Sequence, residues 1–250
     1  MDYIRLGSGE KPLVMIPGVG DGLRTVKGMA APFAVLYRSL TEEFTVYVFS
    51  RRTELLPGMT TRDMADDQNR AMKALGLSKV SLVGVSQGGM IAQWQAIDHP
   101  ERISRLVLAV TMSRPNPTVQ EVIGGWMKMA QAGDYKGIIM DTAEHSYTEE
   151  RLQKTRKMYQ LLGNVGKPKS FDRFMIQAKS CLTHDAYDEL PRISCPTLVI
   201  GGTDDRIATG RASTEIADQI PDSRLKMYLG LGHGLYENPD FLEQVKRFCS

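Results

Sequence analysis

Apolar runs that return at intervals along the chain, with helical stretches between them, constrain the fold most. Runs rich in Val, Ile and Leu occupy residues 12–18, 44–50, 80–86, 103–111, 196–202 and 223–230. Apolar strands that alternate with amphipathic helices are typical of a mostly parallel sheet covered on both faces. The sequence therefore predicts an α/β fold, with a mostly parallel sheet flanked by helices.

Two of the intervening stretches have clear helical signals. Residues 60–77 begin with threonine caps and carry acidic residues in their early turns. Residues 89–100 repeat the apolar residues Met90, Ile91, Trp94 and Ile97 at helical spacing. Both stretches are predicted to be helices that connect parallel strands.

The alternation stops after the fourth apolar run. Residues 113–190 contain no strong strand run, but they hold several helical segments punctuated by Gly and Pro. This composition predicts a helical insertion at residues 113–190, within a core made of residues 1–112 and 191–250. No internal repeat or low-complexity tract is present. A chain of 250 residues is long enough for such a domain to bury a sizeable core.

Charge and cysteine content exclude several classes of function. The net charge of +2 arises from 31 basic and 29 acidic residues scattered along the chain, which gives no footprint for nucleic acid. No signal-like start or apolar run of membrane-spanning length occurs, so we expect a soluble, cytoplasmic protein without a membrane partner. Cys181, Cys195 and Cys249 are far apart and lack zinc-site spacing; we expect free thiols, with Cys249 in a frayed terminus.

Ser86 lies between glycines where a predicted strand passes into a predicted helix. The stretch 84–88 reads GVSQG, a G-x-S-x-G pattern in the strand, turn and helix context of a nucleophile elbow. Small neighbours let strand and helix approach closely, and the helix N-terminus favours negative charge beside the serine. The alternative is a serine helix cap in an ordinary glycine-rich turn. The context favours a nucleophile.

A serine nucleophile requires a base and a group that orients the base. Asp204 and Asp205 follow the run at 196–202, and His233 follows the run at 223–230, in the order serine, acid, histidine. Carboxyl ends of strands are where open α/β sheets gather their sites. One aspartate could instead form a turn, and His233 could be a surface histidine. His99 is expected at a helix end, and His145 and His184 are expected to be structural or solvated.

Four stretches resemble the α/β-hydrolase superfamily over nearly the whole chain. They read VMIPGVGDG, LVGVSQGGMIAQWQAIDHPERISRLVL, PTLVIGGTDDRIA and GLGHGLYENPDFLEQVKRF. The resemblance implies the α/β-hydrolase fold with residues 113–190 as a helical cap. It also selects the acid, because in this family the acid is usually followed by an arbitrary residue and then an aliphatic one. Asp205 fits that pattern better than Asp204.

The same resemblance implies an oxyanion hole and shows two departures from the family. It assigns the two backbone donors to the N–H groups of Val19 and Gln87. Many members carry His-Gly where this chain has Pro17-Gly18, and an Asp-x-Arg-Gly-x-Gly-x-Ser type loop where it reads SRRTELLPGMTTRD at 50–63. The sequence does not explain the second departure. Within the cap, five flexible apolar side chains could line a substrate pocket, but for any one of them packing of the cap against itself is the favoured interpretation: Trp126, Met127, Met129, Met140 and Met158.

The implied chemistry is acyl transfer to water by Ser86, His233 and Asp205, without a metal or organic cofactor. An elbow serine, rather than aspartate, separates this chain from dehalogenases and epoxide hydrolases of the same fold. Ester, lactone, thioester and carbon–carbon bond hydrolysis remain open, as does a ligand-binding protein with no turnover. The expected partner is a small-molecule substrate, and the chain could be a monomer or a homo-oligomer.

Overall fold

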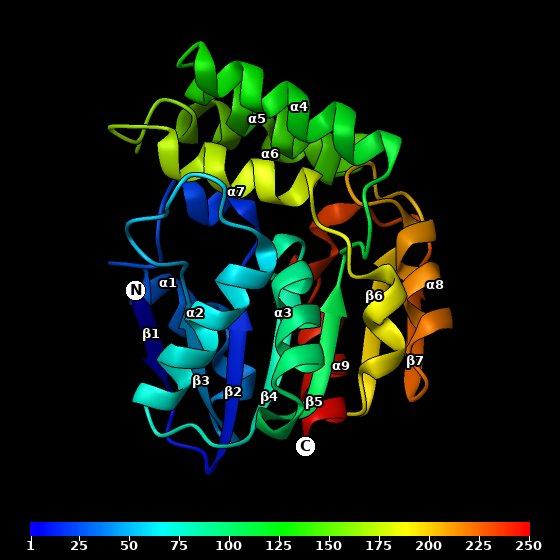
Figure 1. The fold of residues 1–250 in the computed structure, drawn as a ribbon. Helices are drawn as coiled ribbons and strands as arrows, with labels where there is room; N and C mark the ends of the chain where they lie inside the picture. Colours follow the sequence, from blue (N-terminus) through cyan, green and yellow to red (C-terminus); the bar gives the residue numbers. More distant parts are fainter.

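A twisted seven-stranded sheet occupies the centre of the computed structural model, which describes residues 1–250 (Figure 1). Its strand order is β1-β3-β2-β4-β5-β6-β7, and every neighbouring pair is parallel except β1 with β3. The predicted mostly parallel sheet is confirmed. The strands are β1 (Tyr3–Leu6), β2 (Lys11–Ile16), β3 (Phe44–Phe49), β4 (Val80–Val85), β5 (Ile103–Ala109), β6 (Thr197–Gly202) and β7 (Ser223–Tyr228).

Sequence analysis missed β1. This strand has only four residues, and just one of them, Ile4, is buried. It pairs antiparallel with β3 at the edge of the sheet, where one face and one edge meet solvent. A short edge strand of this kind lacks the continuous apolar run that marks a central parallel strand.

Alternate residues of the central strands pack into two separate apolar cores, one on each face of the sheet. Leu82 and Leu106 belong to one cluster, whereas Val83 and Val107 belong to the other. The first core packs against α2 (Thr61–Ala74), α3 (Gln87–Asp98) and α8 (Gly210–Gln219). The second packs against α9 (Pro239–Cys249) and is bordered by α1 (Ala30–Leu36). Helices therefore cover both faces, as the strand pattern predicts.

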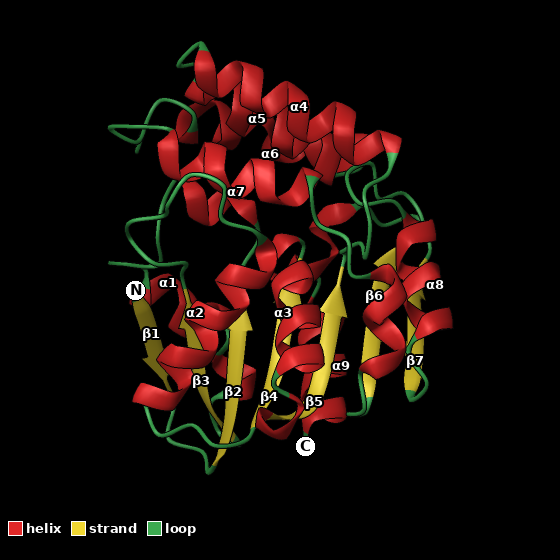
Figure 2. Ribbon diagram, in the orientation of Figure 1, coloured by secondary structure: helices red, strands yellow, loops and turns green.

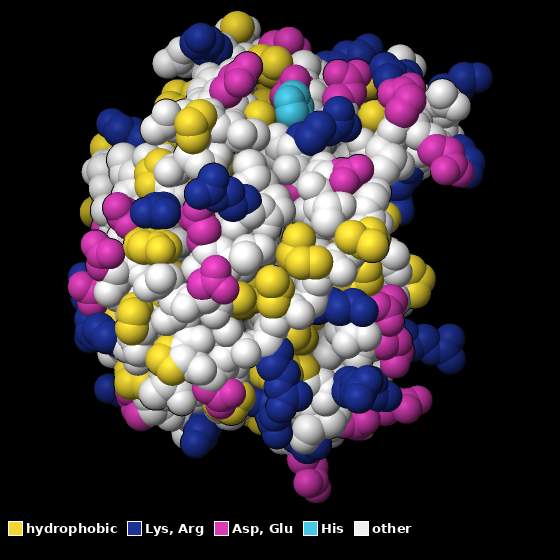
Figure 3. Space-filling view, turned by 90° about the vertical axis from the view of Figure 1, so that its right-hand side faces the viewer, with side chains coloured by type: hydrophobic (Ala, Val, Ile, Leu, Met, Phe, Trp, Pro, Cys, Tyr) yellow, Lys and Arg dark blue, Asp and Glu magenta, His cyan; other side chains and the backbone are white.

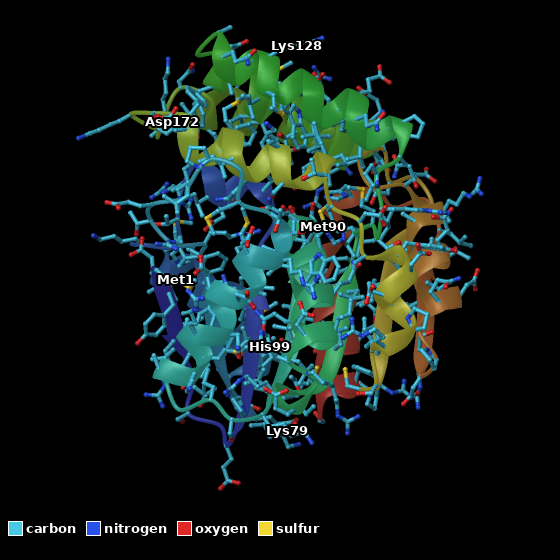
Figure 4. All side chains as sticks on the ribbon, viewed as in Figure 1. Met1, Lys79, Met90, His99, Lys128 and Asp172 are labelled. Atoms are coloured by element: carbon cyan, nitrogen blue, oxygen red, sulfur yellow. The ribbon has the colours of Figure 1, made fainter.

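Four further helices form a layer over one end of the sheet (Figure 2). They are α4 (Pro117–Gln131), α5 (Tyr135–Ser146), α6 (Glu149–Leu162) and α7 (Asp172–Leu182), and we call them the helical layer. The chain enters this layer after β5 and leaves it before β6. Figure 4 shows Met90, in the first turn of α3, close to the layer, whereas Lys79 before β4 lies at the opposite end. The layer therefore covers the carboxyl ends of the parallel strands.

A third apolar core joins the helical layer to the sheet. Met90 of α3 and Met112 after β5 contact a cluster that includes Trp126 of α4 and Phe174 of α7. Each of these four side chains is buried. Burial of apolar surface stabilises a folded protein by about 25 cal/mol per Å². These contacts therefore fix the helical layer to the sheet and make the layer part of the folded domain.

The remaining expectations concern thiols, charge and membranes. All three cysteines are free and buried, and Cys249 packs in the second core, so the expected frayed position for it is wrong. Basic and acidic side chains are interspersed on the face that Figure 3 shows, in keeping with the small net charge. No helix in the structure has both the length and the apolar character needed to cross a membrane.

Candidate active site

Ser86 sits at a strained corner between β4 and α3. Its backbone has φ of 55° and ψ of −122°, a conformation that costs a non-glycine residue on the order of 1–3 kcal/mol. Two hydrogen bonds hold it there: the Ser86 N–H donates to the Ala109 carbonyl at 2.9 Å, and the Thr111 hydroxyl donates to the Ser86 carbonyl at 2.7 Å. Tertiary contacts from β5 and its C-terminal extension thus maintain the strained turn.

The glycines around Ser86 are required by close backbone approach. A Cβ on Gly84 would lie 2.5 Å from the Gly88 carbonyl oxygen, and a Cβ on Gly88 would lie 1.9 Å from the Ile16 carbonyl oxygen. Strand, helix and the end of β2 therefore meet at backbone contact distance. The G-x-S-x-G spacing reflects this packing as well as the turn itself.

His233 and Asp205 form a buried pair. The Asp205 carboxylate oxygens lie 2.9 and 3.1 Å from His233 Nδ1, and both residues are only 6% exposed. The same carboxylate accepts hydrogen bonds from the N–H groups of Ile207 and Ala208. Burial alone would raise the pKa of Asp205, but the charge and hydrogen bond of His233 and the two N–H donors hold it below its usual value.

The neighbouring aspartate points elsewhere. Asp204 is exposed and accepts a hydrogen bond from the Thr203 hydroxyl at 2.8 Å. Both residues follow the end of β6 at Gly202, and the Asp205 N–H donates to the Gly202 carbonyl, so a turn sets their different directions. The structure thus brings Asp205, and not Asp204, against His233.

The other three histidines lie outside this cluster. His99 ends α3 at the far end of the sheet and pairs with Asp66 at 3.0 Å (Figure 4). His145 bonds within α5 to Asp141. His184 is buried beside Thr61, and burial lowers its pKa to about 3, so it is neutral at physiological pH. Each has a local partner that accounts for its position.

Ser86 and His233 line one cavity of about 410 Å³ between the sheet and the helical layer. Apolar side chains make up 15 of its 25 lining residues. From the helical layer come Trp126, Ile138 and Phe174, all nearly fully buried. From the segment around α1 come Met29, Phe33, Leu36 and Tyr37, which we call the α1 wall. A site of this size and lining suits a small, largely apolar ligand.

The cavity separates the candidate pocket residues of the helical insertion from those that pack within it. Of the five side chains proposed from the helical insertion, only Trp126 lines it. Met127 and Met129 pack against the third core, and Met158 is 49% exposed. The α1 wall was not foreseen at all. The sequence feature that could have indicated it is the apolar stretch MAAPFAVLY at 29–37, which lacks the charged outer face of an ordinary surface helix.

The segment after β2 lies beside the serine. A Cβ on Gly18 would be 3.2 Å from Ser86 Cβ and 3.6 Å from Ser86 Oγ. Val19 begins a short 3₁₀ turn and Gln87 begins α3, so the N–H groups of both lack a partner within their own turns. Both residues are buried. Two uncommitted N–H groups therefore flank the serine, where an oxyanion could be bound.

A buried charge network lies behind this segment. Arg51 is 1% exposed, and Asp21 Oδ2 accepts hydrogen bonds from the Arg51 N–H at 3.1 Å and from Arg173 Nη2 at 2.5 Å. Burial lowers the pKa of Arg51 to about 10, although Asp21 opposes this, so the guanidinium stays charged at neutral pH. The 50–63 loop, unexplained by sequence, therefore places an arginine next to the candidate oxyanion hole.

Comparison with known proteins identifies the family. The family model described as alpha/beta hydrolase fold matches residues 11–240. A Caulobacter vibrioides protein, provisionally named the carbamate hydrolase RutD, is 24% identical over 91% of this chain and 85% of its own. A 2-hydroxymuconate semialdehyde hydrolase of Pseudomonas putida is 30% identical over 71% of this chain and 62% of its own.

Solved structures agree on the fold. The enol-lactonase from Burkholderia xenovorans LB400 superposes with a TM-score of 0.83 at 22% identity, covering 99% of this chain and 95% of that one. At this identity the likeness concerns architecture alone. Together with the family match, which spans most of the sequence and both the sheet and the helical layer, it shows that the chain belongs to the α/β-hydrolase family.

Proposed function

We propose that the protein is a serine hydrolase that cleaves an ester or related acyl bond of a small molecule through an acyl-enzyme. Ser86 is the nucleophile, His233 the general base and Asp205 the group that orients the base. The N–H groups of Val19 and Gln87 form the oxyanion hole. The observation that carries this proposal is the buried His233–Asp205 pair, which shares a cavity with a strained elbow serine.

The reaction would proceed in two steps. Because Asp205 contacts His233 Nδ1, that nitrogen carries the proton and Nε2 is free to accept one. Ser86 Oγ attacks the carbonyl carbon as Nε2 takes its proton, and the leaving alcohol then departs with that proton. Water, deprotonated by His233, attacks the acyl-enzyme next. This step releases the acid and restores the Ser86 hydroxyl.

The mostly apolar lining of the cavity favours a substrate with an apolar acyl or alkyl group. The cavity extends from Ser86 to the α1 wall, where Phe33 and Leu36 offer apolar surface. We propose that the helical layer acts as the cap that closes the opposite side through Trp126 and Phe174. Three free cysteines would stay reduced in the cytoplasm, where we place this activity.

Labelling with a fluorophosphonate probe tests the proposal directly. We expect the probe to modify Ser86 in the native protein, and we expect Ser86→Ala to fold normally but to lose turnover of activated short-chain esters. Labelling at another residue, or substantial turnover by Ser86→Ala after contamination is excluded, would refute the proposed nucleophile.

A carbon–carbon bond hydrolase is the second candidate, because the similar Pseudomonas putida protein is named a semialdehyde hydrolase. A panel of short and long acyl esters, lactones and a vinylogous diketone separates the two. Preferred cleavage of the diketone would replace the acyl-bond assignment. A protein that binds these compounds without labelling or turnover would instead be a ligand-binding member of the family.

A further inference from the structure

A single nitrogen atom joins the two segments that carry the proposed oxyanion donors. Arg51 Nη2 lies 2.6 Å from the Pro17 carbonyl oxygen and 2.7 Å from Gln87 Oε1. Pro17 precedes the Gly18-Val19 segment, and Gln87 directly follows Ser86. Each of the two N–H bonds on this nitrogen can serve one acceptor, so Arg51 fastens the two segments to each other.

The surroundings of Arg51 make its burial costly in free energy. The side chain is 1% exposed, and its Nε and Nη1 have no hydrogen-bond partner in the structure. Asp21 Oδ2 lies 3.9 Å from Nη1 and is shared with Arg173. A buried guanidinium is rarely a net source of stability relative to apolar residues of similar volume. Burial in this position demands a reason beyond folding.

We propose that Arg51 is a positioning residue for the oxyanion hole. This inference rests on the proposed function, because it concerns the same two donors. The peptide that joins Pro17 to Gly18 is planar, so a fixed Pro17 carbonyl also fixes the start of the segment that carries the Val19 N–H. The bond to Gln87 Oε1 holds the first residue of α3, whose N–H is the second donor.

The far side of Gln87 supports the same role. Its Nε2 donates to the Gln177 carbonyl at 2.7 Å and to the Ser180 hydroxyl at 3.1 Å, both on α7. The amide is thus bonded at its oxygen by Arg51 and at its nitrogen by the helical layer. Donors preorganised in this way stabilise charge that develops in the transition state without reorganising. Arg51 acts on the donors and does not itself contact the substrate.

Arg51→Met tests the inference, with Arg52→Met as the matched control. Arg52 is the adjacent residue, but its side chain is 42% exposed and pairs with Asp67 at 3.6 Å. We expect Arg51→Met to lower kcat by about 10²-fold with little change in KM, because loss of one oxyanion donor costs about 10²–10³-fold. The control should stay within about twofold of the native kcat, because the Arg52 side chain pairs with Asp67 and not with Pro17 or Gln87.

Inhibition by an aryl trifluoromethyl ketone distinguishes positioning from a merely structural role. Its adduct with Ser86 places a negative oxygen in the oxyanion hole, so its Ki should rise in step with the loss of kcat/KM. A variant that is only less stable would show a lower Tm with an unchanged Ki. Fluorophosphonate labelling of Ser86 should also slow in Arg51→Met, and not in Arg52→Met.

Gln87→Met tests the same bridge from its other end and keeps the backbone donor. We expect a similar loss of kcat, and the double variant should lose less than the product of the two. Suppose that the native protein is labelled at Ser86 and turns over substrate, but that Arg51→Met has a kcat and a Ki close to native. That result would overturn this inference and leave the proposed function intact. Failure of both variants to fold would also overturn it, and failure of the native protein to label would refute the proposed function itself.

Discussion

The two walls of the cavity are built in opposite ways. Behind the segment after β2, Arg51, Asp21 and Arg173 are linked by hydrogen bonds; Arg51 and Asp21 are almost excluded from water, and Arg173 is partly buried. The α1 wall has no such network: α1 carries no charged side chain, none of its residues is buried, and Leu36 is 42% exposed. One wall is held by directional bonds, and the other only by partial apolar contact.

This contrast matches the different demands of chemistry and binding. Stabilising an oxyanion requires donors held to a fraction of an ångström, which hydrogen-bonded, buried groups can provide. Accepting an apolar group requires only surface of suitable shape, and segments with few buried contacts open at low free-energy cost. We therefore expect changes to the first wall to alter rate or folding, and changes to the α1 wall to alter substrate preference.

The largest effect is expected at Asp205, the carboxylate paired with His233. Asp205→Asn should remain folded but lose about 10⁴-fold in kcat/KM, because an amide favours the wrong imidazole tautomer. Asp204→Asn is the matched control, since its side chain is exposed and turned away, and it should cost little. Steady-state kinetics with circular dichroism decide the matter. A severe loss in the control with near-native Asp205→Asn would reverse the assignment.

A large loss of stability is expected within the buried network. Asp21→Asn removes the only acidic side chain paired with Arg51 and Arg173, which leaves the buried Arg51 guanidinium and the partly buried Arg173 guanidinium without a carboxylate. Breaking such a buried pair costs about 3–5 kcal/mol, measurable by urea unfolding. The unfolding free energy of Asp204→Asn should change by less than about 0.5 kcal/mol. Equal stability of the two variants would show that the network is not needed for folding.

A smaller and more selective effect is expected at the α1 wall. Phe33→Ala removes apolar surface from the cavity, so kcat/KM for a long-chain acyl ester should fall about tenfold, the scale of one or two lost methylene contacts. Hydrolysis of an acetyl ester, too short to reach α1, should stay within about twofold. A uniform loss for every chain length would mean that Phe33 is structural and that the acyl group lies elsewhere.

The smallest effect is expected on the outer face of α1. Val35 is 79% exposed and does not line the cavity, so Val35→Ser should change the unfolding free energy by less than about 0.5 kcal/mol. Its chain-length preference should match that of the native protein. If Val35→Ser shifted this preference as Phe33→Ala does, the helix as a whole rather than its inner side chains would control binding.

Local sequence patterns predicted the parallel sheet well because buried parallel strands are continuous apolar runs. The elbow was visible for a similar reason: strand, glycines and helix follow one another within a few residues. The choice of Asp205 over Asp204 came from resemblance to a family, since two adjacent aspartates differ only in direction. Short β1 gave no comparable signal.

Residues whose roles depend on long-range contacts could not be predicted. Arg51 and Arg52 are identical neighbours in sequence, yet one is 1% and the other 42% exposed at the side chain. What separates them is the approach of β2, α3 and α7, segments distant along the chain. The sequence could not tell Trp126, which lines the cavity, from the methionines of the same segment, because helical spacing does not reveal which face of a helix meets the cavity.

The hydrogen bonds that join α7 to Gln87 and to Asp21 have a consequence for substrate entry and product release. Because α7 is tied to the elbow through Gln87 and to Asp21 through Arg173, the helical layer cannot rise without breaking one buried and one partly buried hydrogen bond. Leu36, in contrast, lines the cavity and reaches solvent. We expect molecules to pass in and out beside α1, so that a disulfide or proline that stiffens this segment would slow turnover even with the catalytic groups untouched.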